Sequence, residues 1–184
     1  MLKKYILFFL LIFFSISCSV NGNFKGLYSY YDKTKSESPN LLAYPDIHTT
    51  ICELKNNTTP KIYITNGKEL KKCLINYENL ILFIWSPKCK SKYCYSLNLL
   101  QQNCNRNKIE LIIVSEYYDT ELMQIKYELK NPILGIDTNY YKSNKTSNYV
   151  SKFIFDLTSI EHIDGRLLHF KNGEFVKATD LLNN

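Results

Sequence analysis

The chain has 184 residues, of which 45% are hydrophobic and 22% are charged, and its formal net charge is +6 at pH 7. This length supports one domain with a substantial core. Lysines are spread along the whole chain and form no dense basic cluster, which argues against a nucleic-acid-binding surface. We therefore expect no nucleic acid partner.

The N-terminus predicts export. Residues 1–17 contain Lys3 and Lys4, then an apolar stretch over residues 5–14, then small residues, as in a signal peptide. The apolar stretch is too short to span a bilayer comfortably. The Ser-Ile-Ser-Cys segment that ends at Cys18 resembles a bacterial lipoprotein cleavage site, although the stricter motif begins with an apolar residue. This resemblance implies that Cys18 carries a lipid and becomes the first mature residue. The alternatives are an ordinary cleaved signal and an uncleaved anchor.

Three parts follow from this pattern. Residues 1–17 are the expected signal peptide, residues 18–58 a tether with an N-terminal extension, and residues 59–184 the folded domain. The extension is polar and Tyr-rich, and it has no sustained periodicity. A lipid on Cys18 would hold the mature protein on a membrane, facing the periplasm or cell envelope.

Regular patterns begin at residue 60. We expect a short strand over 61–65, a helix over 67–77, a buried strand over 80–85 and a helix over 93–105.

The second half continues the alternation. A buried strand is expected over 110–115, a helix over 119–129, a short strand over 133–136 and a helix over 147–159. Two strands, 166–170 and 174–178, flank an Asn-Gly pair that predicts a hairpin. The order predicts an α/β fold with a central mixed sheet covered on both faces and a C-terminal β-hairpin.

Five cysteines remain if Cys18 is lipidated: Cys52, Cys73, Cys89, Cys94 and Cys104. An exported protein can form disulfides, but an odd count leaves at least one thiol unpaired or bonded to another molecule. Cys73 and Cys104 lie on apolar helix faces and are expected in the core. The role of Cys52, in the extension, stays open.

The segment 80–94 carries the most specific signal. A buried strand ends in Trp85, a proline and Cys89, and a helical pattern follows. Sites in open α/β sheets lie beyond the carboxyl ends of strands, where Cys89 falls. A helix N-terminus favours a thiolate, and so would the flanking lysines 88, 90 and 92. The alternative is a partly buried cysteine without a redox role.

Cys94 is the candidate second cysteine of a redox pair. Residues five apart on a regular helix differ by about 140° in direction, and a disulfide needs Cα atoms within roughly 7 Å. Pairing therefore requires Cys89 to lie in a loop before the helix, with an irregular turn over residues 90–93. Otherwise Cys94 is a helix residue with no redox role.

Residues 61–178 resemble a thioredoxin-fold domain, most closely the exported, membrane-tethered thiol–disulfide oxidoreductases of bacteria. LILFIWSPKC is similar to the family's strand ending in Phe-Trp-Ala-x-Trp-Cys, and LLHFKNGEFV is similar to its Leu-Phe-Lys-Asn-Gly hairpin. The resemblance implies a thioredoxin-like fold and exchange with protein thiols or disulfides, with no cofactor. It makes Trp85 the family's first Trp, which would pack beside the site, and Cys89 the nucleophile. The resolving role would then fall to Cys94, the candidate second cysteine of this chain.

Three positions depart from the family. Its second cysteine falls on Lys92, its Trp before the first cysteine on Lys88, and its cis-proline near Gly165. That proline normally lies against the active-site cysteines and shapes substrate contact. Oxidoreductase activity is therefore a hypothesis at this stage.

Two other functions are open. A thioredoxin-fold lipoprotein that has lost its catalytic pattern would only bind a partner in the envelope. The chain also resembles the copper-delivery branch of the fold, which uses Cys-x-x-x-Cys. In that case Cys89, Cys94 and His162 would hold copper, because soft thiolates suit Cu(I).

Overall fold

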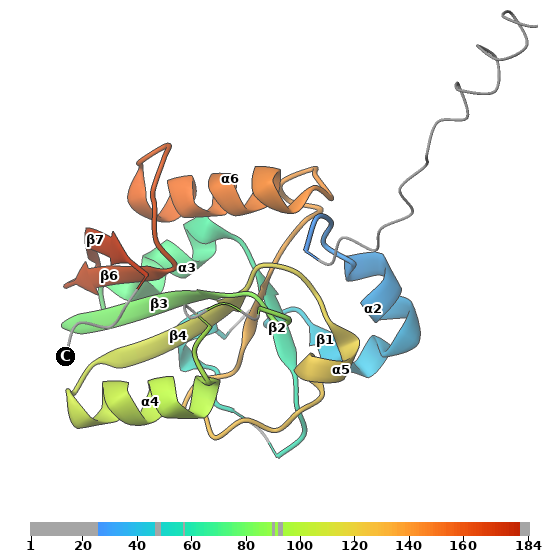
Figure 1. Cartoon of the computed structure of the whole chain (residues 1–184), viewed down its shortest axis with the longest axis horizontal. Helices are drawn as coiled ribbons and strands as arrows, with labels where there is room; N and C mark the ends of the chain where they lie inside the picture. The colour runs from blue at the N-terminus through green and yellow to red at the C-terminus, as the bar shows by residue number, and fades with distance from the viewer. Residues whose placement is uncertain (1–25, 47–48, 57, 90, 92–93, 181–184) are drawn as a thin grey trace, which may run out of the picture.

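The computed structural model describes residues 26–46, 49–56, 58–89, 91 and 94–180. These residues form a seven-stranded mixed sheet with α-helices on both of its faces (Figure 1). The α/β class, the mixed sheet and the flanking helices predicted from the sequence are confirmed.

The sheet has the order β1-β2-β5-β4-β3-β6-β7. Neighbouring strands from β1 to β3 pair in parallel, whereas β6 pairs antiparallel with β3 and with β7. The strands are β1 (Leu42–Ala43), β2 (Ile62–Thr65), β3 (Asn79–Trp85), β4 (Glu110–Ser115), β5 (Leu134–Ile136), β6 (Leu167–Lys171) and β7 (Glu174–Thr179).

Helices cover the two faces as separate layers. On one side α3 and α6 pack over β3 and β4, and α4 packs on the other (Figure 1). Each layer has its own buried cluster, and the sheet lies between them. The helices are α2 (Tyr31–Glu37), α3 (Gly67–Leu74), α4 (Leu97–Arg106), α5 (Thr120–Met123) and α6 (Thr146–Thr158), with 3-10 turns η1 (Pro39–Leu41) and η2 (Ile51–Glu53).

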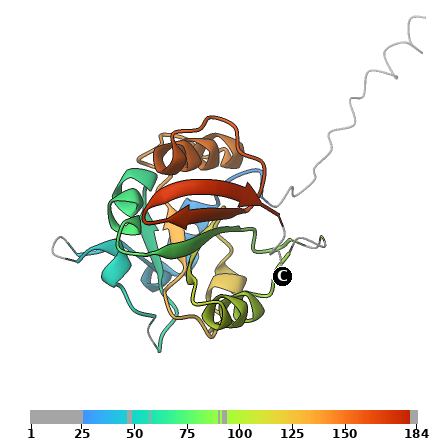
Figure 2. The same ribbon diagram turned by 90° about the vertical axis from the view of Figure 1, so that its left-hand side faces the viewer.

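The C-terminal hairpin forms as predicted. Asn172 and Gly173 both have positive φ, 50° and 83°, which a two-residue hairpin turn with the right-handed strand twist requires. Figure 2 shows the hairpin between the α6 and α4 layers, with β6 completing the sheet beside β3. This pairing buries Leu167 and Leu168 against the two core clusters.

One predicted helix is much shorter in the structure. The pattern over residues 119–129 predicts a helix throughout, but α5 ends at Met123. Downstream backbone groups are hydrogen-bonded by distant side chains instead. Asn56 donates to the Leu129 carbonyl at 3.1 Å, and Asn98 accepts from the Glu128 N–H at 2.9 Å. The Asn98 bond takes the place of the helical bond that the Glu128 N–H would make in a continued helix, and the Asn56 bond gives the Leu129 carbonyl a partner.

The described part of the N-terminal extension packs against the sheet. Tyr31, Leu41 and Ile51 are buried, and β1 adds a parallel strand beside β2. The Ser29 N–H also donates to the Asn144 carbonyl at 2.9 Å. These elements lack a periodic pattern in the sequence because single anchoring side chains, not an amphipathic face, hold them in place.

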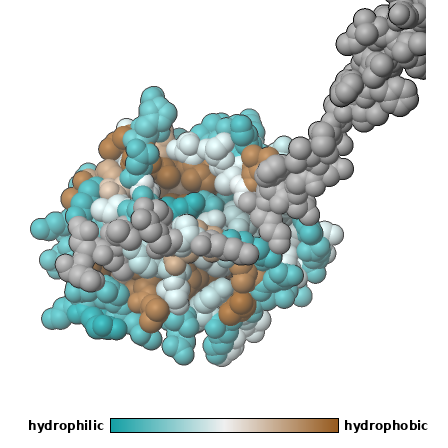
Figure 3. Space-filling model, viewed as in Figure 1, coloured by the Kyte–Doolittle hydropathy of each residue, from teal (hydrophilic) through white to brown (hydrophobic). Residues whose placement is uncertain are grey.

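The surface is mainly polar. In Figure 3 hydrophobic side chains lie in separate patches among hydrophilic ones. Exposed apolar residues come from many different elements, for example Tyr44, Leu99 and Val176. Scattered residues of this kind are normal for a folded domain and do not mark an interface.

Candidate functional site

Cys89 and Cys94 form a disulfide in the loop that leaves the central strand β3. Their Cα atoms lie 5.7 Å apart, and both residues are partly exposed. Two backbone hydrogen bonds hold the ends of this loop: the Cys89 N–H donates to the Ser86 carbonyl and the Cys94 N–H to the Ser91 carbonyl, each at 3.1 Å. The structure therefore joins the two cysteines whose pairing the sequence left open.

The pairing explains why the following helix begins late. The helical pattern begins at residue 93, and the thiolate argument places Cys89 at the N-terminus of that helix, but α4 begins at Leu97. On a continuous α-helix, Cα atoms five residues apart are about 8.6 Å apart, beyond the reach of a disulfide. The disulfide thus excludes helix across this segment, and the prediction that Cys89 begins the helix is wrong.

The Ser91 side chain lies against both sulfur atoms. Its Oγ is 3.5 Å from Cys89 Sγ and 3.4 Å from Cys94 Sγ. A hydroxyl can donate one hydrogen bond and rotate between acceptors. The sequence analysis did not single out Ser91. The feature that could have indicated it is a hydroxyl side chain between the two cysteines.

Lys88 is directed to carboxylates rather than to the cysteines. Its Nζ lies 3.1 Å from Asp119 Oδ2 and 2.9 Å from Glu121 Oε2. Its backbone N–H donates to the Tyr117 hydroxyl at 2.9 Å. These contacts bind the loop to the segment after β4, and the expected effect of Lys88 on a Cys89 thiolate stays a prediction. Lys90 and Lys92 lie outside the described residues.

Tyr117 holds the Lys88 backbone through its hydroxyl group, and its ring is part of the core. It is buried, and burial raises the pKa of its hydroxyl, which keeps the group protonated. Tyr117 follows β4, so it lies at the same carboxyl edge of the parallel strands as Cys89. The sequence placed no role on it.

Trp85 forms the buried end of β3 beneath the disulfide loop. Its side chain is 6% exposed and meets the Tyr127 ring edge-on, with centroids 5.8 Å apart. Its carbonyl accepts a hydrogen bond from the Glu116 N–H at 2.9 Å. The position is that of a packing residue, which fixes where the strand stops and the loop starts.

Gly165 lies before β6, near the position at which the sequence resemblance would place a cis-proline. Its φ is +120°, which suits glycine and not proline, and no described residue follows a cis peptide bond. A Cβ there would lie 2.7 Å from the Thr179 nitrogen, so Gly165 packs closely against β7. The next residue, Arg166, pairs with Glu116 at 3.0 Å and donates to the Ile84 carbonyl at 3.1 Å.

A polar cleft of about 260 Å³ opens beside the disulfide loop. Lys88 lines it together with residues of α2 and the segment 117–121. Lys33 and Glu37 on its α2 side form an exposed pair at 3.7 Å. The cleft is therefore lined by Lys88, the residue that precedes Cys89 in the chain, and it is bounded by side chains of both charges.

His162 is exposed in the loop before the hairpin. Within the described residues, no group of three or more His, Cys, Asp or Glu side chains is arranged to hold a metal ion. The structure thus brings Cys89 and Cys94 together but does not add His162 to them.

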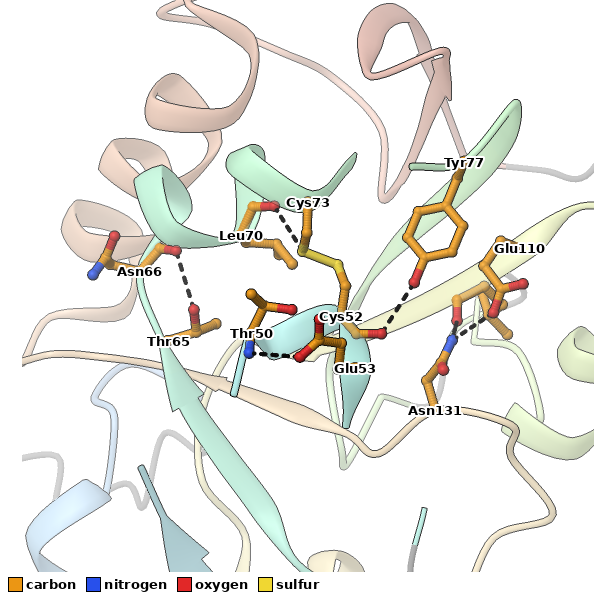
Figure 4. Close-up of a disulfide and its surroundings, with 11 residues drawn as sticks. Thr50, Cys52, Glu53, Thr65, Asn66, Leu70, Cys73, Tyr77, Glu110 and Asn131 are labelled. Carbon is orange, nitrogen blue, oxygen red and sulfur yellow. Dashed lines mark hydrogen bonds between the residues drawn. A yellow bond between two sulfur atoms is a disulfide. The ribbon is translucent and has the colours of Figure 1, made fainter. Parts of the chain in front are cut away.

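A second disulfide joins Cys52 of η2 to Cys73 of α3, with Cα atoms 5.9 Å apart (Figure 4). Cys73 is buried as expected, while Cys52 packs at the border of the same cluster. The Tyr77 hydroxyl donates to the Cys52 carbonyl at 3.4 Å, and Cys73 Sγ lies 3.3 Å from the Leu70 carbonyl oxygen. This bond fastens the extension to the domain, a link that the sequence did not predict.

Cys104 is the free cysteine among the described residues, and it is fully buried on α4. Burial, with a smaller effect of Glu110, raises the pKa of its thiol to about 11. The described cysteines are thus two pairs and one free thiol, in agreement with the odd count. A protonated, buried thiol has little reactivity.

Comparison with protein-family models, with curated proteins and with solved structures found no match to this chain. None of the helices in the described part of the chain is long and apolar enough to cross a membrane.

Proposed function

We propose that this protein performs thiol–disulfide exchange in the cell envelope, with Cys89 and Cys94 as its redox pair. One observation carries the proposal: a disulfide lies in a partly exposed loop directly after the central strand of an α/β sheet. Ligand and reaction sites of such sheets lie beyond the carboxyl ends of strands. Partial exposure lets a substrate sulfur reach the pair.

The fold supports a thioredoxin-like architecture. The strand that precedes Cys89 has a parallel neighbour on one side and an antiparallel hairpin on the other, with helices covering both faces. This arrangement agrees with the resemblance of the strand–Trp–Cys segment and of the Asn-Gly hairpin to that family. The wider spacing of the two cysteines is accommodated by the two turns at Ser86 and Ser91.

The exchange reaction follows from the two sulfurs. In the reduced protein, the Cys89 thiolate attacks a substrate disulfide and forms a mixed disulfide, and one substrate sulfur leaves as a thiolate. Cys94 then loses its proton to solvent and attacks Cys89 Sγ, which releases the second substrate thiolate. Two electrons pass to the substrate, and the Cys89–Cys94 disulfide of the structure is the oxidised product.

The substrate is a protein disulfide or dithiol, and the cleft beside Lys88 offers room for part of its chain. The proposal includes export and a lipid on Cys18, which would place the site at a membrane surface. Residues 1–25, which carry this signal, lie outside the described residues. A Cys18→Ser variant should therefore leave the membrane fraction of a bacterial host.

Trapping of mixed disulfides tests the exchange function. A Cys94→Ser variant of the full chain should accumulate disulfide-linked partners on non-reducing gels, because the resolving thiol is missing. Adding Cys89→Ser should abolish them. Cys73→Ser is the matched control, since it frees the Cys52 thiol away from the proposed site. An absence of Cys89-dependent adducts in the native envelope would refute the exchange function.

A binding-only role is the second candidate, and two observations favour it. Lys88 is held by Asp119 and Glu121, and Gly165 packs against β7 where the family has its proline. A protein with this role should keep its biological activity when Cys89 and Cys94 are both replaced by serine. The exchange function requires that activity to be lost.

A further inference from the structure

We infer that Ser91 is a catalytic residue of this site, because its hydroxyl contacts both reacting sulfur atoms. The inference rests on the proposed function and deepens it. It assigns to Ser91 the stabilisation of the thiolate that appears when the Cys89–Cys94 bond opens. Nothing in the family resemblance assigns a role to this position.

The backbone of Ser91 places its side chain at the disulfide. The Ser91 carbonyl accepts a hydrogen bond from the Cys94 N–H at 3.1 Å, which holds Ser91 close to the disulfide. The same residue then presents Oγ at 3.5 Å from one sulfur and 3.4 Å from the other. The nearly equal distances allow the hydroxyl proton to serve either sulfur by rotation about its C–O bond.

The hydrogen bond becomes stronger when the disulfide opens. Sulfur in a disulfide is a weak acceptor, whereas a thiolate carries a full charge, and hydrogen bonds to charged acceptors are about twice as strong as neutral ones. Ser91 therefore stabilises the open, charged state more than the closed one. This difference lowers the pKa of the cysteine that holds the charge.

The step can be written for reduction of the protein by a substrate dithiol. A substrate thiolate attacks Cys89 Sγ, the new S–S bond forms, and the electron pair of the old bond leaves on Cys94 Sγ. The Ser91 hydroxyl hydrogen-bonds that departing thiolate, which later takes a proton from water. The second substrate thiolate then releases Cys89 as a thiolate and leaves as a substrate disulfide, with two electrons transferred to the protein.

The sequence assigned this role to lysines, and the structure gives Lys88 a different one. Its ammonium lies at 3.1 and 2.9 Å from two carboxylates, so its charge is largely compensated. The Ser91 hydroxyl, by contrast, contacts both sulfur atoms. Within the described part of the site, its position therefore fits the stabilisation of a thiolate.

The test measures the pH dependence of iodoacetamide alkylation of the reduced full chain, with Cys89 and Cys94 peptides resolved by mass spectrometry. Ser91→Ala should move the midpoint of the reactive cysteine upward by about one pH unit, the effect of a lost hydrogen bond to a charged group. Ser91→Thr keeps a hydroxyl and should restore the midpoint. Ser96→Ala is the matched control, because exposed Ser96 makes no side-chain capping bond to α4.

Coincident profiles for Ser91→Ala and the unmodified protein would overturn the inference. Ser91 is exposed, so its loss leaves no core cavity, and the variant should unfold at the same urea concentration. The outcome is separable from the exchange function. Trapping by Cys94→Ser without a Ser91→Ala shift would keep the exchange function and reject the role of Ser91. A shift without trapping would show that Ser91 stabilises the thiolate, but it would reject the exchange function and with it a catalytic role for Ser91.

Discussion

Removing the Cys52–Cys73 disulfide should destabilise the protein more than removing Cys89–Cys94. The first bond closes a ring across a sequence separation of 21, the second across only 5. Loss of chain entropy in the unfolded state stabilises by about 3 kcal/mol for the larger ring and about 2 kcal/mol for the smaller. The larger ring also holds η2 and its buried Ile51 against the core.

The comparison uses Cys52→Ala/Cys73→Ala and Cys89→Ala/Cys94→Ala, unfolded in urea without reductant. With an unfolding slope of about 2 kcal/mol per molar urea, the first variant should lose about 1.5 M in its midpoint. The second should lose less, because its cysteines lie in a partly exposed loop. Equal losses, or a larger loss for the second variant, would refute the assignment of Cys52–Cys73 as the structural staple.

Three further predictions address single side chains. Lys88→Gln should lower the free energy of unfolding by about 1 kcal/mol, because the two ion pairs of Lys88 are lost. Added salt should reduce this loss, and a loss that does not change with salt would contradict the ion-pair explanation. Cys104 should resist iodoacetamide at about pH 8 in the folded protein and react after denaturation, since its pKa is about 11; native labelling would show that the thiol is accessible. Burial, with a contribution from Lys177, lowers the pKa of His169 below 6.5. The unfolded chain therefore binds more protons than the folded protein, and the free energy of unfolding should fall as the pH drops below 6.5. His169→Gln should flatten that part of the urea-midpoint profile, and an unchanged slope would assign it to other groups.

The regular elements of the domain follow from local patterns. The strand over residues 110–115 has the predicted bounds, and the hairpin forms around its Asn-Gly pair. In both cases the determining signal is local in the sequence: an apolar run for the strand and an Asn-Gly turn for the hairpin. Where long-range bonds decide, the patterns mislead: Asn98 binds the Glu128 N–H, which the predicted extension of α5 would have used in a helical bond.

The N-terminal elements illustrate the opposite case. Nothing periodic marks α2 or η1, yet Tyr31 of α2 is 4% exposed and Leu41 of η1 is 5% exposed. Their positions depend on a surface that exists only after the sheet and its helices have assembled. A polar segment with a few anchoring side chains therefore looks like a tether until the partner surface is known.

At the candidate site, the sequence by itself determined that Cys89 follows a buried strand, because an apolar run and its end are local features. Only the tertiary structure decided which sulfurs pair, since a disulfide requires two Cα atoms to approach within a few ångströms. It also turned Lys88 toward Glu121, 33 residues away, and placed Ser91 against both sulfurs. Chain order specifies which groups are present, while their electrostatic roles depend on distances that arise on folding.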